Sequence, residues 1–334
     1  MTFLWTTRTR RVLRVVVAHL LFASSASAHH GNIIFDLDRV VTLHGSISRY
    51  VWRNPHVYVY VYVDVTDVSG QTVEWQLEGD PTPIMTRSGW TPEILSAGDP
   101  VTVRAYPDRE PERPHALLVS LLKADDTILE PRSGGRASEI RATSLAGIWY
   151  GLRGYNTREF VYGRLTEKGA AAQAVYTEAD NPVSECVPYP LPTIIAAPYL
   201  NEIEILDDRI LVRSEFFGVE RTFFTDGRPH PENGTRTNQG HSIAWWEGEV
   251  LVVDTTLYAD YRAGNRSGIP SGAQKHSVER YELSADGKQL LINYVIDDPE
   301  FMVDPMMGIM VWDYAPDREL IPIGCDTQNA TLYE

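Results

Sequence analysis

Residues Val57–Val65 run VYVYVYVDV, with valine at every second position and tyrosine or aspartate between the valines. A period of two places the valines on one face of an extended strand and the other side chains on the opposite face. Valine and tyrosine also favour pleated sheet over helix. The stretch therefore predicts a strand with two distinct faces in a β-rich protein.

Other segments around this strand predict a small barrel. Strands are expected at residues 41–53, 71–78, 100–105 and 116–123, and a short helix is expected at 80–88. Three strands, a helix and two further strands form the order of an OB-like barrel. A generic five-stranded sandwich is the alternative arrangement.

The second half of the chain predicts a larger β structure. Short strand candidates recur between turn dipeptides such as Asp226-Gly227, Glu247-Gly248 and Asp286-Gly287, and one helix is expected at residues 169–180. Such spacing indicates an antiparallel β-barrel of the lipocalin or calycin type, or a sandwich. The chain is thus expected to be mainly β. The predicted divisions are a signal peptide at 1–28, an OB-like barrel at 29–124, a polar linker at 125–144 and an antiparallel β-barrel at 145–334.

The N-terminal segment has the three parts of a secretory signal. A basic start is followed by the apolar run Val15–Ala23 and then by Ala26-Ser27-Ala28. The apolar run is shorter than the ~20 residues that span a bilayer. We expect cleavage after Ala28 and a periplasmic or secreted protein that begins at His29 and has no membrane anchor after cleavage.

Charge and cysteine content narrow the range of partners. The sequence has 30 basic and 45 acidic residues, a formal net charge of −15. This charge disfavours nucleic acid and anionic lipid as partners. The two cysteines, Cys186 and Cys325, are expected to form a disulfide in an oxidising compartment. A metal site with two thiolates is the alternative.

Two stretches resemble bacterial families without known activity. The motifs His29-His30, Phe35-Asp36 and Trp52-Arg53-Asn54-Pro55-His56 resemble a family of small, uncharacterised exported bacterial proteins, with a His-His start and a Trp-x-Asn-Pro-His motif. The second half is similar to another uncharacterised β-rich bacterial domain. Its motifs here are Asp226-Gly227-Arg228-Pro229-His230-Pro231, Gly240-His241-Ser242-Ile243 and Trp246-Glu247-Gly248. Neither resemblance implies a reaction.

The expected N-terminus carries the strongest chemical hypothesis. Signal cleavage frees the amine of His29 and leaves imidazoles at His29 and His30. Such nitrogen donors suit copper by ligand type and by the Irving–Williams order. His56 is the expected further ligand, with His44 and His115 in reserve. In the alternative interpretation the two histidines belong to a disordered tail.

A second candidate site lies in the larger barrel. His241, Asp254, His230 and His276 are candidate catalytic residues, because a histidine beside a carboxylate can transfer protons. Ligand contacts are expected from Arg228, Trp149, Trp245, Trp246 and Tyr281, with Tyr258 and Tyr261 as further aromatic candidates. These residues would suit an apolar small molecule. Structural ion pairs, hairpin turns and a tryptophan-rich core are the alternative explanation.

Three functions follow as expectations. The first is an exported metal-binding protein, copper being the expected metal, whose second barrel holds a small-molecule ligand or another exported protein. The alternative is an enzyme of isomerase, lyase or cyclase type in the second barrel. The third is an adaptor that docks an exported protein on Tyr58, Tyr60 and Tyr62. No P-loop, G-x-S-x-G or H-E-x-x-H motif occurs in the sequence.

Overall fold

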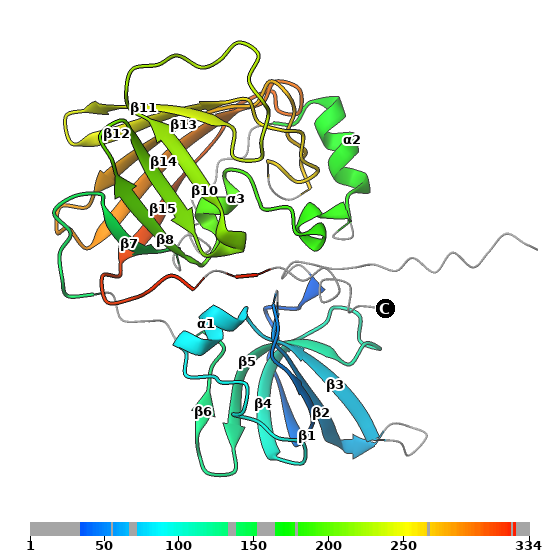
Figure 1. Cartoon of the computed structure of the whole chain (residues 1–334). Helices are drawn as coiled ribbons and strands as arrows, with labels where there is room; N and C mark the ends of the chain where they lie inside the picture. Colours follow the sequence, from blue (N-terminus) through cyan, green and yellow to red (C-terminus); the bar gives the residue numbers. More distant parts are fainter. Residues whose placement is uncertain are drawn as a thin grey trace, which may run out of the picture.

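The computed structural model describes residues 34–54, 56–66, 72–132, 138–151, 164–177, 180–265, 268–321 and 323–324. The predicted signal peptide, His29, His30 and Cys325 lie outside these residues. The fold is mainly β, with a small barrel followed by a larger closed barrel (Figure 1). The predicted fold class is therefore confirmed, and the second unit is a barrel, not a sandwich.

The first barrel has the strand order of an OB fold. Its elements are β1 (Val41–Val51), β2 (Tyr58–Thr66), β3 (Thr72–Glu78), α1 (Thr82–Arg87), β4 (Pro100–Pro107), β5 (His115–Lys123) and β6 (Ile128–Leu129). The strands are ordered β3-β2-β1-β4-β5-β6, and a further pairing of β3 with β5 closes the barrel. Five alternating strands cannot all be antiparallel in a closed ring, and β3–β5 is the parallel pair.

Alternation along the strands fills the interior of the first barrel. Four valines of the VYVYVYVDV stretch lie in its apolar core, namely Val57, Val59, Val61 and Val63, and the first three of them are fully buried. On the opposite face Tyr58 and Tyr60 are also buried, while Tyr62 is exposed. The tyrosine stripe considered for an adaptor is thus largely covered. β6 lies within the stretch predicted as a linker and pairs with β5.

The second barrel is a nine-stranded closed ring. Its strands are β7 (Gly147–Tyr150), β8 (Leu200–Ile205), β9 (Arg209–Ser214), β10 (Glu220–Phe224), β11 (His241–Glu247), β12 (Val250–Thr256), β13 (His276–Leu283), β14 (Gln289–Asp297) and β15 (Met306–Tyr314). The helical segments are α2 (Glu167–Val175), η4 (Pro182–Glu185), α3 (Thr193–Ala196) and η5 (Phe216–Gly218). No helix in the described part of the chain is both long and apolar enough to span a membrane.

An odd number of strands again forces one parallel pair, here β10–β11. Parallel neighbours need a long connection, because the chain must return to the end at which it started. Residues 225–240 provide this connection and arch over the outside of the barrel (Figure 1). We call residues 225–240 the crossover segment. A connection of this kind is needed because an odd number of strands in a closed ring requires one parallel pair.

The interior of the second barrel contains a buried ion pair. Both guanidinium Nη atoms of Arg221 donate to the carboxylate of Glu279, and the Tyr281 hydroxyl donates to Glu279 Oε1 at 2.8 Å. Burial lowers the pKa of Arg221, but the Glu279 carboxylate outweighs this effect and raises it overall. Tyr281, predicted to contact a ligand, is instead part of this packed core.

The helix α1 belongs to the first barrel and contacts the second (Figure 1). Its Ile84 packs into the core of the second barrel. Arg87 donates two hydrogen bonds, of 2.8 and 2.6 Å, to the buried carboxylate of Glu215. Glu215 also accepts from the backbone nitrogens of Leu200 and Ile321. Because this carboxylate would be costly to leave unpaired, the contact fixes α1 against the second barrel.

Candidate functional sites

The first barrel holds a histidine–carboxylate group beside its parallel pair. The β3–β5 register pairs Gln76 with His115, and Glu78 lies two residues further along β3. Glu78 Oε1 lies 3.3 Å from His56 Nδ1, and Glu78 Oε2 lies 3.7 Å from His115 Nε2. Asp108 Oδ2 lies 3.4 Å from His115 Nδ1. We call Glu78, His115, Asp108 and His56 the Glu78 group.

Burial and hydrogen bonding orient the two imidazoles. Glu78, Asp108 and His115 are 6%, 3% and 5% exposed. His56 Nδ1 also lies 3.2 Å from the carbonyl oxygen of Gly79. Since both neighbours of this nitrogen are oxygen acceptors, Nδ1 carries the proton, and in the neutral ring the lone pair is on Nε2.

The chain enters the first barrel next to this group. The backbone nitrogen of Asp36 donates to Pro107 O at 2.8 Å, and that of Arg109 donates to Ile34 O at 2.8 Å. The ring of Phe35 packs against His115, with their centroids 4.9 Å apart. Ile34, the first described residue, therefore lies beside the Glu78 group.

The second barrel brings all four candidate catalytic residues into one hydrogen-bonded group. His230 comes from the crossover segment, and its Nε2 lies 2.9 Å from Asp254 Oδ1 on β12. His276, at the start of β13, places Nε2 2.8 Å from Asp254 Oδ2. His230 Nδ1 lies 2.9 Å from Nδ1 of His241, the first residue of β11. We call these four residues the Asp254 group.

The hydrogen bonds of the Asp254 group have defined donors and acceptors. Asp254 accepts from both imidazoles, so in neutral His230 the other nitrogen accepts from His241. Burial raises the pKa of Asp254, but hydrogen bonds from His276 and His230 outweigh it and lower the pKa overall. The hydrogen bond to Asp254 raises the pKa of His276. Burial and the neighbouring His230 lower the pKa of His241. The two terminal imidazoles therefore differ in basicity.

The Asp254 group lies on the outer wall of the barrel. Strand alternation points Thr255 inward, where it is fully buried, and Asp254 outward. The side chains of Asp254 and His276 are 22% and 42% exposed. The crossover segment covers them only in part. The group is consequently open to solvent and separate from the packed interior.

The predicted ligand contacts do not meet in one pocket. Trp149 is fully buried and donates to Leu145 O, whereas Trp245 and Trp246 are exposed. Arg228 forms an ion pair with Asp226. Its guanidinium also lies 4.0 Å from the ring centre of Phe224, whose ring stacks on His241. Of the five predicted ligand contacts, only Arg228 is linked to the Asp254 group.

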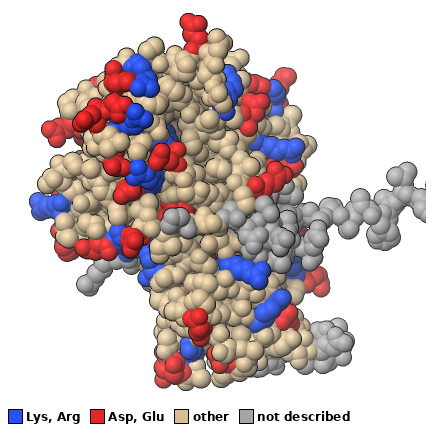
Figure 2. All heavy atoms as spheres, in the orientation of Figure 1, with Lys and Arg blue, Asp and Glu red and all other residues tan. Residues whose placement is uncertain are grey.

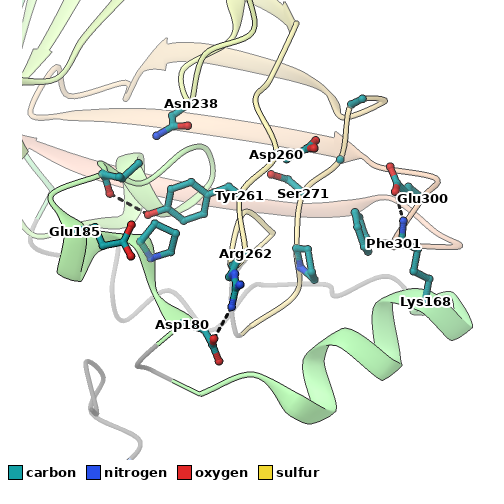
Figure 3. Close-up of a pocket in the computed structure, with 15 residues that line it drawn as sticks. Lys168, Asp180, Glu185, Asn238, Asp260, Tyr261, Arg262, Ser271, Glu300 and Phe301 are labelled. Carbon is teal, nitrogen blue, oxygen red and sulfur yellow. Dashed lines mark hydrogen bonds and ion pairs between the residues drawn. The ribbon is translucent and has the colours of Figure 1, made fainter. Parts of the chain in front are cut away.

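A cleft of about 830 Å³ lies elsewhere on the second barrel (Figure 3). Its walls come from α2, η4 and the loops that follow β12 and β14. None of the predicted catalytic or metal-binding residues lines it, although Tyr261, one of the aromatic candidates, does. The sequence signal for this cleft was weak, because its polar residues are scattered between residues 168 and 301.

The predicted metal site and disulfide both include residues outside the described part of the chain. Within the described residues, no group of three or more His, Cys, Asp or Glu side chains could hold a metal ion. The predicted pairing of Cys186 with Cys325 involves a residue outside the described part of the chain and stays a prediction. On the face shown in Figure 2, acidic and basic side chains are interspersed, and the described residues form no broad basic patch there.

Comparisons with known proteins find one family-model match, within the first half of the chain. Residues 18–116 match a family of unknown function, DUF6152. Among solved structures, the chain is similar to a mutant of the fluorescent protein UnaG, at 12% identity and a TM-score of 0.26, over 51% of this chain and 96% of that one. No curated protein matches the chain.

Proposed function

We propose that the protein binds a transition metal, with copper favoured by ligand type, through His29, His30 and His56, the last of which is oriented by Glu78 within the Glu78 group. The supporting observation is the entry of the chain beside that group, where Ile34 and Asp36 pair with Arg109 and Pro107. His30 precedes Ile34 by four residues. At about 3.3–3.6 Å per residue, this segment reaches at most about 14 Å from Ile34.

The chemistry of the donors fits this proposal. A free amine and the imidazole of the same histidine chelate one ion, and imidazole suits Cu(II). The Nδ1–H of His56 faces oxygen acceptors at Glu78 and Gly79, so the neutral ring has its lone pair on Nε2. A carboxylate behind a histidine ligand fixes the ring and raises its basicity. Binding must also release protons, so the affinity should fall as the pH falls through the histidine range.

Calorimetric titration with Cu(II) tests the proposal. Protein that starts at His29 is compared with protein that carries one glycine before His29. The extension removes the amine from the chelate and should weaken binding more than Glu78→Gln, for which the loss of an outer partner predicts about a 10–100-fold decrease. His56→Ala should also weaken binding.

The matched control is His44→Ala. His44 pairs with Thr102, which in turn pairs with Leu122, far along β5 from His115. The His44→Ala variant should bind Cu(II) with the same affinity as the wild type. Equal affinities of the extended and native N-termini, or of His56→Ala and the wild type, would contradict the proposal.

The hydrogen-bonded Asp254 group favours a second candidate function, acid–base catalysis on a small molecule. His230 can pass a proton between His241 and Asp254, because it contacts both at 2.9 Å. The wild type, Asp254→Asn and His230→Gln are incubated with an extract of bacterial small molecules, and the mixtures are compared by mass spectrometry. A compound consumed by the wild type alone would support catalysis. Identical profiles in all three would rule it out for that mixture.

Three finer expectations accompany the proposal. Export to the periplasm or medium after cleavage at Ala28 is testable by N-terminal sequencing of the exported protein, which should begin at His29. The disulfide between Cys186 and Cys325 should appear as a mass increase on reduction and alkylation. The assignment of residues 145–334 to a second uncharacterised bacterial domain also stays a proposal.

A further inference from the structure

We propose that the cleft on the second barrel binds a small organic cation, a primary amine. This site is separate from the metal proposal, which concerns the first barrel. At about 830 Å³ the cleft is large for a lone ion and within the range of pockets for small organic ligands. Figure 3 shows its wall residues arranged around an open space between α2 and the loops of the barrel.

The cleft residues Ser271 and Gly272 belong to a loop that is held by contacts with residues outside the cleft lining. Asp298 Oδ2 accepts from Asn265 Nδ2 at 2.8 Å and from the backbone nitrogen of Gly272 at 3.0 Å. The ammonium of Lys275 donates to Leu191 O and Gly264 O, both at 2.6 Å. Because these contacts are buried, the loop that carries Ser271 and Gly272 is organised before any ligand arrives.

Three buried oxygens in and next to this loop have no hydrogen-bond partner within the described residues, and one of them belongs to a residue that lines the cleft. They are Ser271 Oγ, Asn265 Oδ1 and Asp298 Oδ1. Their residues are between 0% and 2% exposed, and Ser271 lines the cleft directly. A buried polar atom without a partner costs about 1–3 kcal/mol. Since the Ser271 hydroxyl can accept a hydrogen bond, a ligand in the cleft that donates a hydrogen would compensate for this cost at that atom.

The rim of the cleft attracts positive charge. Four acidic and two basic side chains line it, a formal excess of two negative charges. Asp180 pairs with Arg262 and Glu300 pairs with Lys168. The carboxylates of Glu185 and Asp260 have no ion-pair partner among the described residues. These two exposed acids are therefore available to a cationic ligand.

One side chain of the cleft already shows how an ammonium group is held there. The ammonium of Lys168 pairs with Glu300 and lies 5.0 Å from the ring centre of Phe301. A carboxylate and an aromatic face are the two features that stabilise an organic cation in a binding site. Tyr261 also lines the cleft, where its hydroxyl donates to Val187 O at 3.0 Å. The lining chemistry thus points to an amine over a neutral polyol.

Calorimetric titration of the full chain tests this inference with three compounds of similar length: putrescine, 1,4-butanediol and succinate. We expect putrescine to bind and the neutral and anionic compounds not to bind. The double variant Glu185→Gln/Asp260→Asn should weaken putrescine binding at least about tenfold, because both unpaired carboxylates are neutralised. Ser271→Ala should weaken it less, by removing one acceptor.

Glu249→Gln serves as the control for attraction to the acidic surface, since Glu249 is an exposed acid in the turn between β11 and β12. This variant should bind putrescine like the wild type. Unchanged affinity in the double variant, an equal loss in Glu249→Gln, or butanediol binding as strongly as putrescine would each overturn the inference. A metal-binding defect would leave this result unaffected, so the two proposals fail independently.

Discussion

The closed ring of each barrel has an odd number of strands, β1 to β5 in the first and nine in the second, and each ring closes through one parallel pair with a histidine–carboxylate group beside it. In the first barrel Glu78, His115 and Asp108 are buried, and Glu78 and His115 lie on the two paired strands. In the second barrel the group is partly exposed, and one member, His230, comes from the crossover segment. Closure of a barrel thus brings distant polar residues together, while the path of the connection decides how deeply they are buried.

The energetic consequence differs between the two groups. A carboxylate that is 6% exposed, as in Glu78, has little water to replace a lost partner. Asp254, whose side chain is 22% exposed, can be solvated when a partner is lost. Substitutions in the Glu78 group should therefore affect the stability of the barrel, whereas those in the Asp254 group should act mainly on the crossover segment.

The largest effect is expected from Glu78→Ala. This change leaves the buried His115 without one of its two carboxylates and should lower the free energy of unfolding by about 1–3 kcal/mol. Urea unfolding measures the loss. Glu112→Ala, an exposed acid near Asp108, should stay within about 0.5 kcal/mol of the wild type. Similar losses in both variants would mean that burial of the Glu78 group has no energetic role.

A smaller effect is expected from Asp254→Ala. The loss in the free energy of unfolding should be below about 1 kcal/mol, because the ion pairs of Asp254 are partly exposed. Amides of the crossover segment should nevertheless exchange with deuterium faster, since His230 loses its anchor. A global loss as large as that of Glu78→Ala would remove the distinction between the two groups.

The smallest effect is a difference in titration within the Asp254 group. His276 should titrate at a higher pH than His241, because Asp254 raises the pKa of the former and burial lowers that of the latter. NMR of the imidazole nitrogens measures both midpoints. In Asp254→Asn the pKa of His276 should move down toward about 6.5. A midpoint of His276 at or below that of His241 would contradict the assigned contacts.

The pKa shifts of His276, Asp254 and His241 determine whether the stability of the fold rises or falls with pH. The raised pKa of His276 contributes stability that is complete below about pH 6.5 and is lost as the pH rises through its folded pKa. The lowered pKa of Asp254 contributes stability above about pH 4 that is lost on further acidification. The His276–Asp254 contact should therefore stabilise most between about pH 4 and 6.5. The lowered pKa of His241 acts oppositely, favouring the folded state above about pH 6.5.

Local patterns predicted the fold well where they were strongest. The alternation in Val57–Val65 corresponds to β2, and the sequence order of the first half corresponds to an OB-like barrel. The helix predicted at residues 169–180 is α2, which spans Glu167–Val175, because Thr166 accepts from Gly169 N and caps it earlier. Boundaries of this kind depend on single hydrogen bonds that composition does not reveal.

The sites show where sequence reasoning reaches its limit. Turn and strand motifs identified four candidate residues: His230, His241, Asp254 and His276. Their shared hydrogen bonds are apparent only in the fold, in which β10 and β11 pair in parallel. Aromatic character alone grouped Trp149 and Trp245 as ligand contacts, whereas Trp149 lies in the core and Trp245 is exposed. The sequence did not predict the cleft for which we propose an amine ligand, because Asp260, Ser271 and Glu185 become neighbours only through long-range folding.

Different roles for the two histidine groups can be distinguished by adding Cu(II) in small steps to protein that starts at His29. Side-chain nitrogen signals of all histidines are followed by NMR, since the paramagnetic ion broadens nearby nuclei. We expect His56 and His115 to broaden first, while His230, His241 and His276 keep their signals until the metal is in excess. Broadening of the Asp254 group before the Glu78 group would contradict this assignment of roles.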